Sequence, residues 1–144
     1  MKKIYNSQAT GLHLPPGYGP YRYEIKTINL KNIVDNLWGI GPTRITETPH
    51  YKYVMGDSGP LEEYFQSCKG HTWGRAGTAA ENMTVKELIS EFDVILQSEK
   101  DYLEPPYEKH YIIVGSNWHC IDGLRRACTL LGHGIEEAPV AWVY

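Results

Sequence analysis

The sequence predicts one α+β domain in which a small mixed β-sheet is packed by helices. Three stretches carry this prediction. Residues 84–103 have the apolar spacing of a long amphipathic helix, and residues 21–30 alternate like a half-buried strand. Residues 111–144 have the pattern strand, turn, strand, helix, strand. A chain of 144 residues is a usual length for one domain, so we expect a single hydrophobic core.

Composition excludes several classes of protein. Hydrophobic content of 42% and charged content of 22% are typical of a folded globular chain, and the net charge of -3 gives no general attraction to nucleic acid. No apolar run is long enough to cross a membrane, and Met1–Asn6 lacks the apolar region of a signal peptide. Cys68, Cys120 and Cys128 have no metal-ligand spacing, which favours reduced thiols in the cytoplasm.

Residues 1–20 are expected to form an N-terminal arm, and residues 21–144 the domain. Leu14–Pro20 holds three prolines and two glycines, which disfavour a helix or a central strand. The arm would lie across the domain or contact a second copy of the chain in a homo-oligomer.

The first strand is expected at residues 21–30. Its apolar side chains start on one face, at Tyr23, and continue on the other, at Ile28. We therefore expect a bulge near Lys26, followed by a short helical turn at residues 30–34.

Residues 41–59 are expected to be a polar loop with a functional role. Arg44, Glu47 and His50 lie there among proline and glycine. Arg44 would bind an anion, a desolvated Glu47 would act as a general base, and His50 would need little tuning to do so near neutral pH. The alternative is an exposed loop with incidental charges.

Two helices are expected between this loop and the C-terminal segment. Residues 60–68 form a short helix, and Thr84 with Glu87 gives the longer helix a capping box. The apolar face of residues 84–103 would pack on the sheet. Residues 69–82, which hold a histidine, a tryptophan and an arginine, would be either a flexible lid or a plain connector.

The C-terminal segment is expected to contain the site. Residues 111–114 and 118–121 would pair as a hairpin, and a helix would start at Leu124. Gly134 suits the end of that helix, and residues 139–144 would form the closing strand.

Four residues at the junction of hairpin and helix predict a phosphate site. Asp122 would cap the helix, and Gly123 would let a ligand approach the backbone. Arg125 and Arg126 lie in the first turn, where cations are mildly unfavourable unless an anion binds. The alternative is that Asp122 only caps and pairs with one arginine while water solvates the other.

Ile121–Arg126 (IDGLRR), with the hairpin before it and Gly134 and a Pro-Val strand after it, resembles the ParB/sulfiredoxin superfamily. The box of that superfamily is typically Gly-Glu-Arg-Arg or Asp-Gly-His-His-Arg, and it binds nucleotide phosphates. Gly41–Arg44 loosely matches a Pro-x-Arg-like element upstream. Leu124 departs from the usual glutamate or histidine, and the position of the sulfiredoxin cysteine is also Leu124, which disfavours that activity.

The resemblance implies an enzyme dependent on Mg²⁺ and ATP or another nucleoside triphosphate, a phosphotransferase acting on a small molecule or nucleotide. Asp122 would hold Mg²⁺ or orient a substrate hydroxyl, and Glu47 or His50 would be the base. The phosphates would be bound by Gly123, Arg125, Arg126 and Arg44.

Two other functions stay open. A DNA-associated domain of nuclease or partition type is permitted by the resemblance, but the net acidity and the lack of a helix-turn-helix extension after Tyr144 disfavour it. A non-catalytic protein that binds an anion or nucleotide is the other. The six histidines are scattered, so we do not expect a zinc site.

Overall fold

The main sheet has five strands in the order β1-β2-β7-β5-β6. In chain order these are β1 (Tyr5–Asn6), β2 (Arg22–Asn29), β5 (Ile113–Gly115), β6 (Cys120–Asp122) and β7 (Glu137–Val143). The β5–β7 pair is parallel and the other pairs are antiparallel, so the sheet is mixed, as predicted. The structure is a computed structural model that describes residues 5–6, 22–37, 39–68, 83–99 and 111–144.

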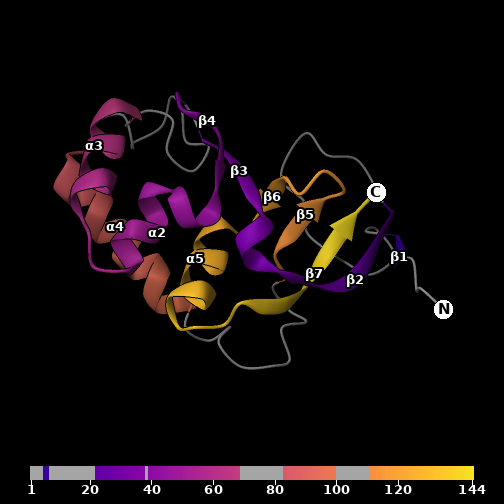
Figure 1. The fold of residues 1–144 in the computed structure, drawn as a ribbon. Coiled ribbons are helices and arrows are strands. Elements are labelled where there is room, and N and C mark those ends of the chain that lie inside the picture. The colour runs from indigo at the N-terminus through magenta and orange to yellow at the C-terminus, as the bar shows by residue number, and fades with distance from the viewer. Residues whose placement is uncertain (1–4, 7–21, 38, 69–82, 100–110) are drawn as a thin grey trace.

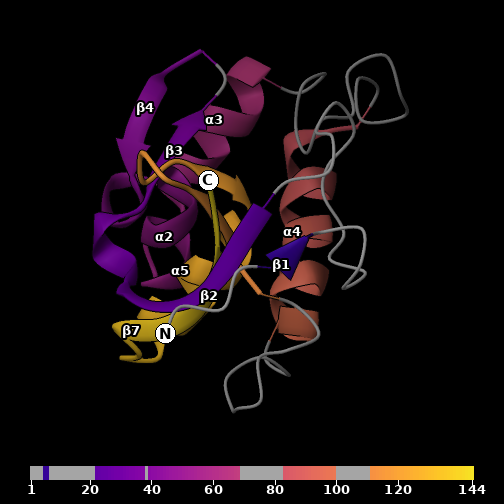
Figure 2. The ribbon, with the colours of Figure 1, turned by 90° about the vertical axis from the view of Figure 1, so that its right-hand side faces the viewer.

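Helices cover one end of the molecule. They are α2 (Pro49–Val54), α3 (Gly59–Cys68), α4 (Val85–Glu99) and α5 (Leu124–Gly132). Figure 1 shows α2, α3 and α4 gathered at one end, the main sheet at the other, and α5 between them. Figure 2 looks from the sheet end, with β2 in front of α5. The predicted α+β class is confirmed, and α5 is the helix that joins the sheet to the helical end.

Strand β2 is regular along its length. It pairs with β7 without a shift from Tyr23 opposite Val143 to Asn29 opposite Glu137, so the bulge predicted near Lys26–Thr27 is wrong. The apolar pattern changes face because both faces of the sheet are covered. Tyr23 belongs to one buried cluster and Ile28 to another.

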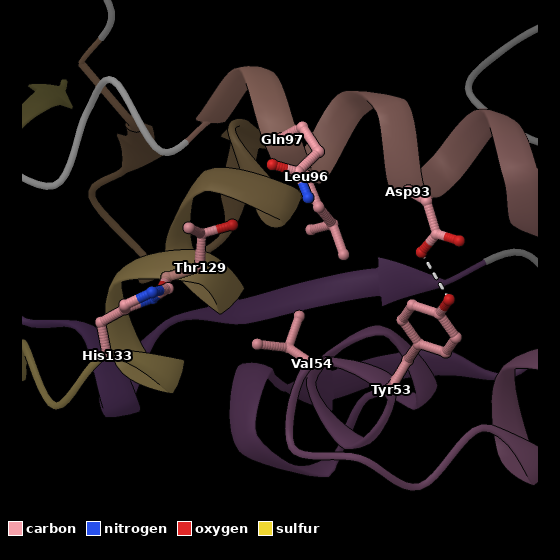
Figure 3. A pocket seen from close by; sticks show the side chains of 7 residues that line it. All are labelled: Tyr53, Val54, Asp93, Leu96, Gln97, Thr129 and His133. Carbon is pink, nitrogen blue, oxygen red and sulfur yellow. Dashed lines mark hydrogen bonds between the residues drawn. The ribbon is translucent and has the colours of Figure 1, made fainter.

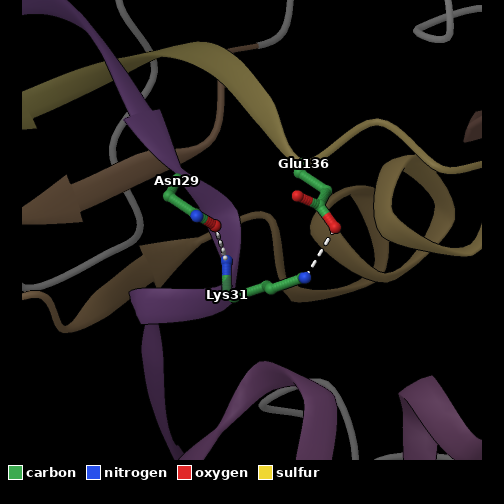
Figure 4. A network of polar contacts seen from close by, with 3 residues as sticks. All are labelled: Asn29, Lys31 and Glu136. Atoms are coloured by element: carbon green, nitrogen blue, oxygen red, sulfur yellow. Dashed lines mark hydrogen bonds and ion pairs between the residues drawn. The ribbon is translucent and has the colours of Figure 1, made fainter.

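The exit from β2 is tied to the start of β7. Asn29 Oδ1 accepts a hydrogen bond from Lys31 N at 2.9 Å, which caps the short 3₁₀ helix η1 (Leu30–Asn32) expected here. Leu30 N donates to Glu136 O at 2.8 Å. Figure 4 shows the ion pair between Lys31 Nζ and Glu136 Oε1, 2.5 Å apart. The pair is exposed and contributes little, so the backbone bond and the cap fix this corner.

The loop predicted at residues 41–59 is wrong, because most of the segment is regular. It contains β4 (Gly41–Arg44), which pairs with β3 (Val34–Leu37) in a second sheet, then the 3₁₀ helix η2 (Ile45–Glu47) and α2. Thr48 starts α2 with its side chain, which accepts from the backbone N–H three residues later, and a proline follows in the first turn. These local signals are present in the sequence but lie within a stretch rich in glycine and proline.

The helical end has a core of its own. Leu88 and Phe92 of α4 pack with Leu61 and Phe65 of α3, and all four are buried. The helix predicted at residues 60–68 is therefore confirmed, but the expected packing of the long helix on the sheet is wrong. Its apolar face meets α3, and α5 covers the sheet instead. Residues 100–103, the predicted end of the long helix, lie outside the described residues.

The capping box of α4 is formed as predicted and gives a stability test. Thr84 Oγ1 accepts from Glu87 N at 3.1 Å, and Glu87 Oε1 accepts from Thr84 N at 3.3 Å. We expect Thr84→Ala to lower the free energy of unfolding by about 1 kcal/mol in a urea titration, because the side-chain acceptor of the Glu87 N–H is lost. Ser90→Ala, at an exposed position in the same helix, is the control. Equal losses in the two variants would contradict the prediction.

The C-terminal segment follows the predicted order. The hairpin of β5 and β6, the start of α5 at Leu124 and the positive φ of Gly134 are all confirmed. Of the expected arm, the structure describes Tyr5–Asn6, which pair with the edge of β2. Leu14–Pro20 and the expected lid at residues 69–82 lie outside the described residues.

Candidate anion site at the start of helix α5

The start of α5 is fixed by a glycine between a strand and a helix. Asp122 is the last residue of β6 and pairs with Ile113, and Gly123 follows at the N-cap position with φ of 107°. A Cβ added to Gly123 would lie 3.1 Å from the Ile112 Cα. The missing side chain therefore makes room for the neighbouring strand. Its predicted contact with a ligand through the backbone stays a prediction.

The cap predicted for Asp122 is wrong. Asp122 is exposed, and in the described part of the chain it accepts no hydrogen bond from the first turn of α5. The physical reason is its extended backbone: the strand continues through Asp122, and the left-handed glycine then turns the chain into the helix. The first turn of α5 contains no acidic residue. Its partial positive charge is thus not offset by a carboxylate there.

The two arginines lie where the sequence predicts, but they extend toward different neighbours. Both are half-buried. Arg126 Nη1 donates to Tyr111 O at 3.1 Å, on the side of β5. The charge of Arg125 lowers the pKa of His50 in α2, so Arg125 acts on a different neighbour. Successive residues of a helix point about 100° apart, which accounts for the separation.

His50 is buried among aromatic rings and is not a base near neutral pH. Its ring centroid lies 5.2 Å from that of Tyr64 and 5.7 Å from that of Phe92. Burial, and secondarily the charge of Arg125, lower the pKa of His50 to about 3, so the role predicted near neutral pH is wrong. His50 Nδ1 is buried and has no hydrogen-bond partner. A buried polar atom of this kind requires an explanation, such as a ligand or an ion.

Glu47 and Arg44 lie at the ends of η2 and β4, before α2. Both are exposed. Glu47, at the end of η2, lines a cavity of about 320 Å³ together with Lys52 and Glu63, between α2 and α3. It makes no hydrogen bond or ion pair with Asp122 among the described residues. The three candidate catalytic residues are thus not brought together by the described contacts.

A group that the sequence did not predict lies between β3 and β6. Asp35 of β3 is half-buried, and its carboxyl is within hydrogen-bonding reach of the Cys120 thiol. Burial raises the pKa of Asp35, and burial with the nearby Asp35 charge raises the pKa of Cys120 well above its usual value. Burial also raises the pKa of Cys128 to about 12. These thiols stay protonated and are poor nucleophiles. Asp35 comes near Cys120 because β3 lies beside the segment that leads into β6, a contact that the sequence did not predict.

Comparison with protein-family models, with curated proteins and with solved structures finds no match to this chain. Within the described ranges, no helix combines the length and apolar character needed to cross a bilayer. The same ranges hold no group of three or more His, Cys, Asp and Glu side chains suited to a metal ion.

Proposed function

We propose that the chain binds the phosphate groups of a nucleoside triphosphate, or of a related phosphorylated small molecule, at the start of α5. One observation carries the proposal: a nine-residue helix whose first turn holds Arg125 and Arg126 and no acidic side chain. First-turn amides have no acceptor within their own helix, and the helix dipole favours an anion at this end. Guanidinium groups add charge-assisted hydrogen bonds to phosphate oxygens.

His50 supports the same location independently. Its Nδ1 is buried without a partner, and the charge of Arg125 acts on its pKa, so the ring is close enough to Arg125 for their charges to interact. A neutral imidazole has one N–H donor and one acceptor nitrogen. A ligand oxygen beside Arg125 would accept a hydrogen bond from this imidazole. It would thereby remove the free-energy cost of burying Nδ1 without a partner.

A phosphotransferase remains the catalytic form of this proposal. Asp122 is exposed and directly precedes Gly123. Mg²⁺ carried on nucleotide phosphates needs only one or two protein carboxylates, so Asp122 fits the role of a metal ligand, and the ion would neutralise phosphate charge. With the pKa of His50 lowered to about 3, Glu47 is the remaining candidate base. The ParB/sulfiredoxin-like relationship, suggested by Ile121–Arg126, belongs to the same proposal.

Calorimetry with ATP, with and without Mg²⁺, tests phosphate binding. We expect Arg125→Gln to weaken ATP binding about tenfold or more, because a charge-assisted hydrogen bond is lost. Arg22→Gln, an exposed arginine on β2, is the matched control and should bind like the wild type. An Arg126 variant would also remove the hydrogen bond to the Tyr111 carbonyl.

Three results would overturn the proposal. The first is that ATP and inorganic pyrophosphate both fail to bind the folded wild-type protein. The second is that Arg125→Gln and Arg22→Gln bind ATP equally well. The third is that adenosine binds as tightly as ATP, because the phosphates would then contribute nothing to the affinity. A circular dichroism spectrum of each variant checks that the fold is retained.

A further inference from the structure

Besides the cavity at Glu47, a second cavity lies near the C-terminal end of α5, between α2, α4 and α5. Its volume is about 400 Å³, within the range of small-molecule sites. Val54 of α2 and Leu96 of α4 form its apolar middle. Figure 3 shows Asp93 with Tyr53 on one side of these residues and His133, which follows the last turn of α5, on the other. The cavity thus has an apolar centre between two polar ends.

The end at Asp93 is a negative acceptor. Tyr53 Oη donates to Asp93 Oδ1, with 2.5 Å between the oxygens. Burial, the Asp93 hydrogen bond and the charges of Asp93 and Glu62 raise the pKa of Tyr53 to about 12, so the hydroxyl keeps its proton at neutral pH. Oδ1 of Asp93 holds this proton donor, and Oδ2 accepts no hydrogen bond among the described residues. Among the described residues that line this cavity there is no lysine or arginine.

The end at His133 is also an acceptor. His133 Nδ1 lies 2.8 Å from Thr129 O. A carbonyl oxygen only accepts, so Nδ1 carries a proton, and in the neutral form of the ring Nε2 is the acceptor. Gln97, whose amide can donate or accept, lies on the α4 side of the cavity. A ligand that fits has a donor at each end and an apolar body between them.

We infer that the cavity between α2, α4 and α5 binds a small organic cation, a primary amine with an apolar body and a second hydrogen-bond donor at its far end. The ammonium pairs with Asp93, the body packs on Val54 and Leu96, and the second donor faces His133. Burying the apolar body adds to the ion pair. An anion is disfavoured here by Asp93 and the nearby Glu62. The inference is independent of the phosphate site at the other end of α5.

Tyramine is a suitable probe, because it carries an ammonium, an aromatic body and a hydroxyl. Its matched control is 3-(4-hydroxyphenyl)propionate, which has the same body and a carboxylate. In methyl-detected NMR titrations we expect tyramine to shift the Val54 and Leu96 signals and the carboxylate compound to leave them unchanged. Absence of tyramine-induced shifts, or equal shifts with both compounds, would overturn the inference.

Two variants locate the ammonium. We expect Asp93→Asn to weaken tyramine binding about tenfold or more, since the charge is removed while an oxygen that can accept from Tyr53 is kept at this exposed position. Tyr53→Phe frees Asp93 Oδ1, so tyramine should bind as well as before or better. Glu137→Gln, an exposed carboxylate on β7, is the charge control. Unchanged affinity in Asp93→Asn would place the amine elsewhere and refute the inference.

Discussion

Acidification below pH 6.5 is expected to destabilise the folded protein, and His50→Leu is expected to remove much of that sensitivity. The usual pKa of the imidazole is 6.5, and burial lowers the pKa of His50 to about 3 in the folded state. The unfolded chain therefore binds a proton that the folded chain excludes. Stability from this residue is complete above pH 6.5 and is lost as the pH falls toward 3, by at most about 1.4 kcal/mol per pH unit.

The same substitution should raise stability at neutral pH. Leucine has a volume close to that of histidine and no orphaned polar atom, while His50 Nδ1 is buried without a partner. Urea titrations of the wild type and His50→Leu at several pH values measure both effects. Asp35 acts in the opposite direction, because its pKa is raised by burial and protonation at low pH favours the folded state. The difference between the two proteins isolates His50.

His133→Gln is the control for the pH experiment, because it removes an exposed histidine. Its stability should follow the wild-type pH profile. Parallel profiles for the wild type and His50→Leu would mean that His50 does not resist protonation in the folded state. Because the charge of Arg125 also acts on His50, the calorimetric titration with ATP should be repeated on His50→Leu. A weaker response would link the buried nitrogen to the phosphate site.

Local signals in the sequence were sufficient for the elements that surround the site. The capping pair Thr84 and Glu87 predicts the start of α4 because both partners lie within one helical turn. Gly123 and Gly134 mark the two ends of α5 because the chain adopts positive φ at each. The cap predicted at Asp122 is wrong by one residue. The N-cap is the next residue, a glycine in the left-handed conformation, although sequence rules favour an aspartate there.

Pairing between distant segments could not be predicted in the same way. Strands β3 and β4 have four residues each, and β3 is held to the turn of β5 and β6 by the bond from Val34 N to Trp118 O. Neither strand has a periodicity long enough to detect. The environment of His50 has the same origin, because its aromatic neighbours come from α3 and α4. Residue type predicted a titrating base at His50, and tertiary packing produced a buried neutral ring.

Phe92→Ala is expected to be among the most destabilising single substitutions in the helical end. Phe92 is fully buried, and its ring centroid lies 5.7 Å from that of His50, 5.5 Å from that of Tyr53 and 6.1 Å from that of Phe65. It therefore joins α2, α3 and α4. Removing the ring leaves a cavity among three helices, and we expect a loss of about 3–5 kcal/mol in the free energy of unfolding.

Val94→Ala on the same helix is the matched control. Val94 is 69% exposed, so its substitution should change the free energy of unfolding by less than about 0.5 kcal/mol. Hydrogen exchange should show where Phe92→Ala acts. The cluster of Leu61, Phe65, Leu88 and Phe92 is separate from the clusters on the sheet, so amides of α4 should lose protection more than those of β7. Equal loss of protection in α4 and β7 would show instead that the helical end and the sheet unfold as one unit.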